Sequence, residues 1–215
     1  MSEAEAVTTV VTDLSSKDGC DKLTLCSSDG HWFVLDEAAA KRSMTVRNTL
    51  EDLGGSTVPL PNVKGVVLAK VAEHMMRCHA NEVNEAAIKA AIKAGSAAQA
   101  GSDAQAGSDA QAGSAAQAGS DAQAAMDAAK AGFDEYVSEM KRDLAEKDNR
   151  PMLFDLILAA NYLNLADLLD MTCELVASLM RGRTAEEIRV AFDIKNDFTP
   201  EEEEEVRREN MWAFE

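Results

Sequence analysis

The sequence predicts a single α/β domain, in which helices pack on a small sheet, followed by two further helices at the C-terminal end. Residues 23–35 alternate apolar and polar side chains around a turn, as a β-hairpin does. Residues 63–78 then carry apolar side chains every three or four positions, which is typical of an amphipathic helix. Four short helical patterns fill the last third of the chain, from Pro151 onwards. A sheet covered by helices accounts for these three observations.

Composition and charge limit the classes of partner. The 215 residues hold 21 Lys and Arg against 38 Asp and Glu, which gives a formal net charge of -17. Such a chain repels nucleic-acid phosphates and anionic membranes, so we expect neither as a partner. The first residues lack the basic and apolar regions of a signal peptide. We therefore expect a protein of the cytoplasm and nucleus, with its four cysteines as reduced thiols.

The first part of the chain predicts a leader and then the start of the domain, over residues 22–85. Residues 1–21 are small, polar and acidic, and we expect them to be flexible. The hairpin follows, with its turn at Ser28, Asp29 and Gly30.

Three helix starts are predicted after the hairpin. Asp36 and Thr45 are candidate N-caps of two short helices, the second of which ends before Gly54. Residues 57–62 contain two prolines, which confine this stretch to a short or edge strand. Asn62 is the candidate N-cap of the amphipathic helix after it.

Residues 86–131 change character. Five tandem copies of AGSAAQ or AGSDAQ occupy residues 94–123, without a large apolar side chain. A Gly every six residues costs about 1 kcal/mol each time relative to Ala, so an isolated helix is not expected. We interpret this part as a disordered insert, either a tolerated loop expansion or a functional tract that acts as a spacer or a low-complexity interaction segment.

The domain resumes over residues 132–181. Residues 133–150 form a charged amphipathic pattern, and Pro151 begins a helix that is apolar nearly all round, as expected at the centre of a core. A second helix runs from Leu165 to Met180, with Gly182 as its terminator.

Residues 182–215 predict two helices whose starts are strongly specified. Thr184 with Glu187, and Thr199 with Glu202, are capping boxes. The bodies of these helices carry few apolar residues, too few to hold a terminal segment firmly against the ordering entropy. The residues could be satellite core, which periodicity alone favours, or a surface that a partner covers.

No pattern of a catalytic or metal site stands out in the sequence. His74 and Cys78 lie four residues apart on one helix, but a zinc site normally needs three or four ligands with recognisable pair spacings. The chain has no GxSxG, phosphate-binding loop or dinucleotide-binding motif. We predict no catalytic residues, no metal and no cofactor, and a thiol- or metal-dependent enzyme remains only as an alternative class.

Two blocks of sequence resemble the Skp1 family, with a plant-like ending. The first contains SSDG at 27–30, TLEDLG at 49–54 and VPLPNV at 58–63. The second contains LFDLILAANYLN at 153–164, LLDMTCELVA at 168–177, GRTAEEIR at 182–189 and the run from Phe192 to the final WAFE. This resemblance implies a BTB/POZ-type domain followed by two C-terminal helices. It also implies a non-catalytic adaptor that joins a cullin to F-box proteins in SCF ubiquitin ligases.

The resemblance also assigns contact residues. Asn161 and Tyr162 correspond to the family's cullin-facing segment. The F-box contact carries over to Leu153, Ile157, Ile188, Phe192, Ile194, Asn196, Phe198, Val206, Asn210 and Trp212. We also expect a weak homodimer when no partner is bound, and the alternative function is a BTB-type self-association module. The repeat insert and the loosely matching residues 133–152 depart from the family, which leaves open a narrower F-box choice or a loss of cullin binding.

Overall fold

The computed structural model describes residues 11–14, 21–100 and 112–213. The chain divides into two compact units: unit 1 is Met1–Leu175, and unit 2 is Val176–Glu215. Each unit is treated by itself below.

The sheet of unit 1 has four strands in the order β1-β3-β2-β4. These are β1 (Val11–Asp13), β2 (Lys22–Ser27), β3 (Trp32–Asp36) and β4 (Thr57–Leu60). Strands β2 and β3 form the predicted antiparallel hairpin, with Leu25 opposite Phe33. Strand β4 pairs in parallel with β2 at one edge, as the prolines of residues 57–62 suggested.

Strand β1 is a correction to the predicted flexible leader. Val11–Asp13 pairs in parallel with β3, placing Thr12 opposite Phe33, and the amide of Leu14 donates to the carbonyl of Val34 at 2.8 Å. Three residues are too few to show an alternating pattern, so only the neighbouring strand reveals this one. The other leader residues, 1–10 and 15–20, lie outside the described part.

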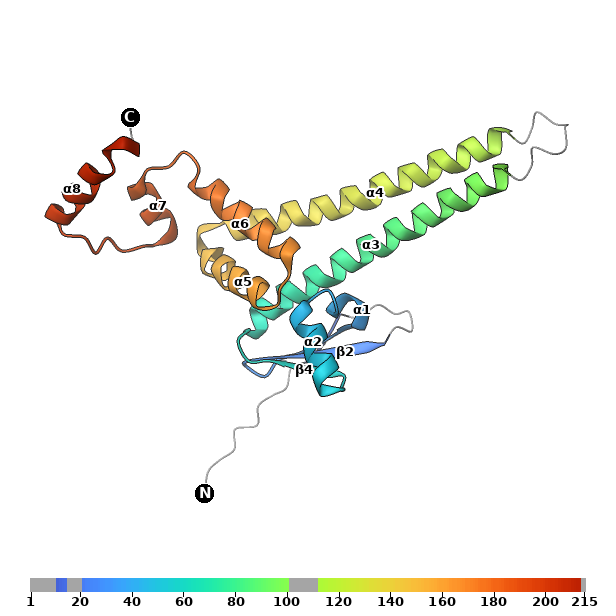
Figure 1. The fold of residues 1–215 in the computed structure, drawn as a ribbon, viewed down its shortest axis with the longest axis horizontal. Coiled ribbons are helices and arrows are strands. Elements are labelled where there is room, and N and C mark those ends of the chain that lie inside the picture. Colours follow the sequence, from blue (N-terminus) through green and yellow to red (C-terminus); the bar gives the residue numbers. More distant parts are fainter. Residues whose placement is uncertain (1–10, 15–20, 101–111, 214–215) are drawn as a thin grey trace, which may run out of the picture. The chain divides into compact units, whose positions relative to one another are not determined.

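Helices cover one face of the sheet (Figure 1). Alternate strand residues are buried, among them Leu23, Leu25 and Leu35. The helices α1 (Glu37–Ala40), α2 (Met44–Leu53) and α3 (Gly65–Ala100) follow these strands in the chain and contact them. The predicted α/β architecture is therefore present.

Two helix starts differ from the prediction. Ser43, rather than Thr45, is the N-cap of α2, and its hydroxyl accepts from the amide of Val46 at 3.1 Å. Helix α3 begins at Gly65, and the carboxylate of Asp29 in the hairpin turn accepts from the Gly65 amide at 2.9 Å. Asp29, which lies 36 residues before Gly65, thus caps the start of α3 in place of the expected Asn62.

The repeat region is helical on both sides of the part that is not described. Helix α3 runs to Ala100 and α4 (Ala112–Ala145) starts within the repeats, so the prediction of a disordered insert is wrong for these residues. The two helices lie side by side (Figure 1). Half-buried residues of α4 recur at spacings of four and three along it: Ala122, Met126, Ala129 and Phe133. Pairing of two helices supplies stability that an isolated Gly-containing helix lacks.

The remaining helices complete the core of unit 1. A short 3₁₀ turn, η1 (Lys147–Asn149), leads into α5 (Arg150–Tyr162), and α6 (Ala166–Met180) follows. The completely buried side chains include Leu68, Met75, Leu144, Leu156 and Leu168. They come from both sides of the repeats, so the two sequence blocks share one core.

Unit 2 contains α7 (Ala185–Phe192), α8 (Pro200–Glu209) and a 3₁₀ turn, η2 (Met211–Ala213). Both predicted capping boxes are confirmed, since Thr184 and Glu187 exchange hydrogen bonds, as do Thr199 and Glu202. Helix α7 ends at Asp193, whose φ of 54° is left-handed. Ala191 is the one buried residue on these two helices among those described.

Candidate functional site

The end of α5 is held in a fixed geometry. Asn164 has a φ of 53°, the amide of Leu165 donates to the carbonyl of Ala160, and the amide of Asn164 donates to that of Asn161. These two bonds form a Schellman motif, which ends a helix and reverses the chain. Asn161 is exposed and Tyr162 is half-buried at this end.

Two hydroxyl groups of α2 and its cap tie down the same segment. Thr45 Oγ1 donates to the carbonyl of Tyr162 at 2.7 Å, and Ser43 Oγ donates to that of Leu163 at 2.6 Å. The bond from Ser43 is buried. Helix α5 extends through Asn161 and Tyr162, so both residues stand on a rigid helix end.

The predicted F-box residues on α5 differ in burial. Leu153 is completely buried in the core, so its predicted contact with a partner is corrected to a packing role. Ile157 is half-buried. Sequence reasoning missed Phe154 and Leu158, which are exposed, the latter by 67%. They lie four residues apart, on one face of the helix. The sequence did not indicate that this face is exposed, because α5 is apolar nearly all round.

In unit 2, one arginine links the two helices. Arg189 Nη1 on α7 lies 3.4 Å from Glu203 Oε1 on α8, and the Arg189 guanidinium lies 5.9 Å from the centre of the Phe198 ring. Asn196 Nδ2 donates to the other oxygen of Glu203 at 3.5 Å. Because ion pairs at this exposure contribute little, the two helices are held together only weakly.

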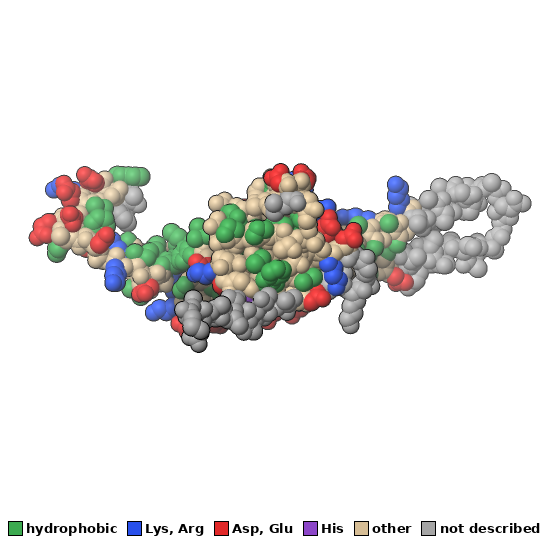
Figure 2. Space-filling model, turned by 90° about the horizontal axis from the view of Figure 1, so that it is seen from below, with side chains coloured by type: hydrophobic (Ala, Val, Ile, Leu, Met, Phe, Trp, Pro, Cys, Tyr) green, Lys and Arg blue, Asp and Glu red, His purple; other side chains and the backbone are tan. Residues whose placement is uncertain are grey.

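Unit 2 presents many large apolar side chains to solvent. Among the predicted residues, Ile188 and Phe192 are half-buried. The exposed ones are Ile194, Asn196, Phe198, Val206, Asn210 and Trp212. Trp212 is 76% exposed, and Val190 and Met211, which the prediction omitted, are also exposed. Figure 2 shows hydrophobic and acidic side chains next to one another on this unit.

A groove of about 790 Å³ lies within unit 2, between α7 and α8. Ala185, Val206 and Met211 contribute apolar surface to it, and Arg189 and Glu203 lie along it. An apolar groove with a charged border can receive an apolar segment of another protein. We call this groove and the exposed apolar residues of unit 2 the α7–α8 surface.

The residues singled out for metal chemistry form a buried pair. Cys78 Sγ lies 3.3 Å from His74 Nε2, and both side chains are buried. Burial lowers the pKa of His74 to about 4 and raises the pKa of Cys78 to about 11. Within the described residues, no group of three or more His, Cys, Asp or Glu is arranged to hold a metal ion.

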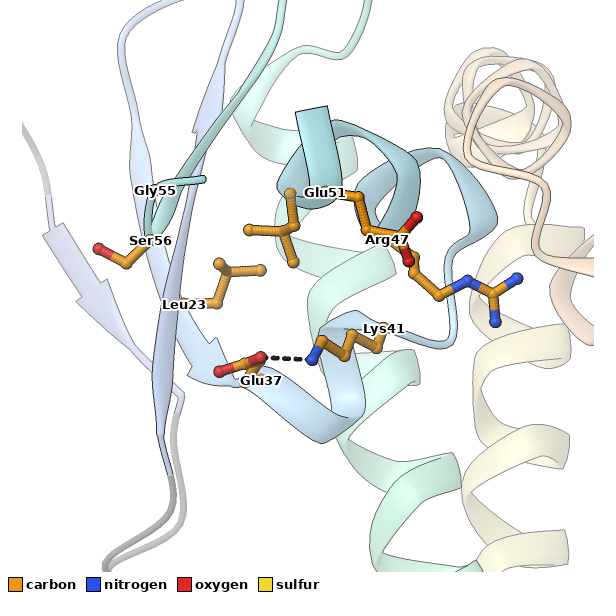
Figure 3. Close-up of a pocket in the computed structure, with 8 residues that line it drawn as sticks. Leu23, Glu37, Lys41, Arg47, Glu51, Gly55 and Ser56 are labelled. Atoms are coloured by element: carbon orange, nitrogen blue, oxygen red, sulfur yellow. Dashed lines mark ion pairs between the residues drawn. The ribbon is translucent and has the colours of Figure 1, made fainter. Parts of the chain in front are cut away.

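Another hollow, of about 310 Å³, opens between β2, α1 and α2 (Figure 3). Leu23 and Leu50 line it, and its charged residues are Glu37, Lys41, Arg47 and Glu51. Lys41 Nζ pairs with Glu37 at 2.5 Å. The opposite charges balance, so this hollow has no preference for an anion or a cation.

None of the described helices is long and apolar enough to cross a membrane.

Comparison with known proteins finds a family match in each of the two sequence blocks. Residues 21–80 match the model of the Skp1 family, tetramerisation domain, and residues 166–213 match the Skp1 family, dimerisation domain. SKP1-like protein 1 of Oryza sativa subsp. japonica is 50% identical over 194 residues, which cover 90% of this chain and 95% of that relative. The chain belongs to the Skp1 family.

Other Skp1-family relatives match over similar lengths. SKP1-like protein 1A of Arabidopsis thaliana is 45% identical and is covered over 98% of its length, with 90% of this chain aligned. The SCF ubiquitin ligase complex protein SKP1a of Dictyostelium discoideum is 37% identical, over 87% of this chain and 92% of that relative. The resemblance and the BTB/POZ-type fold are thus confirmed, and the plant relatives agree with the plant-like ending.

Proposed function

We propose that this protein is the non-catalytic adaptor of an SCF (Skp1–cullin–F-box) ubiquitin ligase. In this role it joins a cullin to F-box proteins, which present substrates for ubiquitination. The observation that carries the proposal is the α7–α8 surface: strongly capped helices whose large apolar side chains remain exposed. Exposed Trp and Phe side chains are the anchors that dominate protein interfaces. The role corresponds to a protein of the cytoplasm and nucleus.

We assign F-box contacts to each unit separately. Ile157 and the newly found Phe154 and Leu158 contribute from α5. The contributors from unit 2 are Ile188, Phe192, Ile194, Asn196, Phe198, Val206, Asn210 and Trp212. Removing an anchor at the centre of an interface costs at least about 2 kcal/mol, or roughly 30-fold in affinity.

We assign the cullin contact to Asn161 and Tyr162. The Schellman motif and the hydroxyls of Ser43 and Thr45 support this assignment, because they hold this helix end without a partner. A preformed surface loses little entropy on binding.

Co-purification with an F-box peptide and with the N-terminal domain of a cullin tests the proposal. A protein with Phe198→Ala and Trp212→Ala should lose the F-box peptide and keep the cullin. A protein with Asn161→Lys and Tyr162→Lys should do the reverse. Val66→Ala, an equally exposed apolar residue on α3, is the matched control and should keep both. Failure of the unaltered protein to bind either partner would refute the adaptor role.

A BTB-type self-association module is the second candidate. It is favoured by the descriptions of the two matching family models, which name dimerisation and tetramerisation. Light scattering distinguishes the candidates. A homodimer that persists when F-box peptide is added would support the module, whereas an adaptor should form a one-to-one complex with the peptide.

A further inference from the structure

A separate hollow of about 250 Å³ lies in unit 1, between α3, α4 and α6. Its apolar lining comes from Phe133, Val137 and Met171. Its polar residues are His74, Lys141, Asp167, Asp170 and Glu174, so three carboxylates face one ammonium group. We call it the α6 acidic hollow.

His74 gives this hollow a feature that surface carboxylates alone lack. Its side chain is only 4% exposed, and its Nδ1 has no hydrogen-bond partner among the described residues. The other ring nitrogen already faces Cys78. A buried nitrogen without a partner costs free energy, which a ligand that hydrogen-bonds to it would recover. The depressed pKa keeps His74 neutral at pH 7, so the ring does not repel a cation.

The existing ion pairs leave one carboxylate available. Lys141 Nζ pairs with Glu174 at 3.3 Å, and Arg42 pairs with Asp167 at 2.5 Å. Asp170 has no ion-pair partner within the part of the chain that is described. The hollow therefore combines an unpaired carboxylate, an unpaired buried nitrogen and an apolar lining.

We propose that the α6 acidic hollow receives an arginine side chain of a protein partner. The guanidinium donates to Asp170 and to His74 Nδ1, while its methylene stem packs on Val137 and Met171. Phe133 offers an aromatic ring to the cation. Arginine fits better than a metal ion because no suitable ligand group exists among the described residues. The inference does not depend on the adaptor role, since it concerns none of the residues assigned to the cullin or the F-box.

The proposal fixes a histidine tautomer. A guanidinium only donates, so Nδ1 must accept, and the ring proton must lie on Nε2, directed at Cys78 Sγ. Titration of the ¹³C,¹⁵N-labelled full chain with N-acetyl-arginine amide, followed by NMR of the ring nitrogens and of the methionine methyl groups, tests this. We expect saturable shifts of His74 Nδ1 and of the Met171 methyl group. An Nδ1 that carries the proton in the complex would overturn the proposal.

Matched probes and variants separate the arginine from general charge effects. N-acetyl-citrulline amide has the same shape without the charge, and it should bind about tenfold more weakly. Asp170→Asn should weaken the arginine probe by a similar factor, whereas Asp148→Asn, an exposed carboxylate outside the hollow, should not. Equal binding of both probes, or an unaltered response in Asp170→Asn, would refute the proposal. Free arginine should bind no better than the capped amide, and tighter binding of free arginine would exclude a protein partner as the source.

Discussion

The hydroxyl of Ser43 donates to the carbonyl oxygen of Leu163, 120 residues away, across 2.6 Å. Ser43 Oγ also accepts from the amide of Val46, so one side chain both caps α2 and anchors the segment after α5. Ser43→Ala should lower the free energy of unfolding by about 2 to 3 kcal/mol, because it removes a cap and leaves a buried carbonyl unpaired. Urea unfolding measures this. Ser138→Ala, which removes an exposed bond within α4, should change it by less than about 0.5 kcal/mol.

The link between α7 and α8 predicts a local effect. Glu203 accepts from both Arg189 and Asn196, so Glu203→Gln should loosen α8 while unit 1 stays folded. Because the ion pair is partly solvated, the cost should stay below about 1 kcal/mol. Hydrogen exchange of the α8 amides should become faster by a few-fold. Glu204→Gln, an exposed neighbour, is the control. Equal acceleration in both variants would contradict a specific link through Glu203.

Two glycines in helices should respond to alanine in opposite directions. A Cβ on Gly132 in α4 meets nothing within 4 Å, so Gly132→Ala should stabilise the protein by up to about 1 kcal/mol. A Cβ on Gly65 would lie 2.7 Å from His31 Nδ1 and 3.0 Å from Asp29 Oδ1. Gly65→Ala should therefore be destabilising, because it pushes the hairpin turn away from the start of α3. Thermal unfolding distinguishes the two, and stabilisation by both would be a contradiction.

The buried His74 predicts a dependence of stability on pH. Burial lowers its folded-state pKa from 6.5 to about 4. Between these values the unfolded chain binds the proton more readily, so stability is complete above pH 6.5 and falls as the pH is lowered towards 4. The full contribution is about 3 kcal/mol at 1.36 kcal/mol per pKa unit. In His74→Phe the difference in unfolding free energy between pH 7 and pH 4.5 should shrink. An unchanged difference would show that other groups cause it.

Deleting the repeats tests whether they support the core. The buried side chains described in unit 1 all lie outside residues 94–123. Replacing these residues by a short turn should leave the free energy of unfolding within about 1 kcal/mol, since loop-closure entropy changes slowly with length. The helical signal in circular dichroism should decrease because the ends of α3 and α4 are removed. Loss of cooperative unfolding would show that the paired helices are part of the core.

Local patterns were sufficient to predict much of the fold. The hairpin turn at Asp29 and Gly30 and the capping boxes at Thr184 and Thr199 are confirmed, because their bonding partners lie within a few residues. The choice between Ser43 and Thr45 as the cap could not be predicted. Both hydroxyls suit an N-cap, and carbonyl oxygens more than 100 residues away decide between their roles.

Partners distant in the sequence account for the other differences. Strand β1 is formed by pairing with β3. The glycine-containing helices α3 and α4 are stabilised by packing against each other. Exposure was predictable where an apolar residue stands among polar ones, as Phe198 does. It was not predictable on α5, where the apolar pattern gives no sign that Leu153 points inwards and Leu158 outwards.

The left-handed conformation of Asn164 affects the heat capacity and entropy changes that calorimetry would measure on binding. It locks the end of α5 before any partner arrives, whereas α8 has no buried side chain among those described. Association at the α5 end should therefore resemble the docking of rigid bodies. Association at α8 should fix a weakly held helix in place, with a larger loss of heat capacity and a larger opposing entropy. The two faces of one small protein would then show different dependences of affinity on temperature.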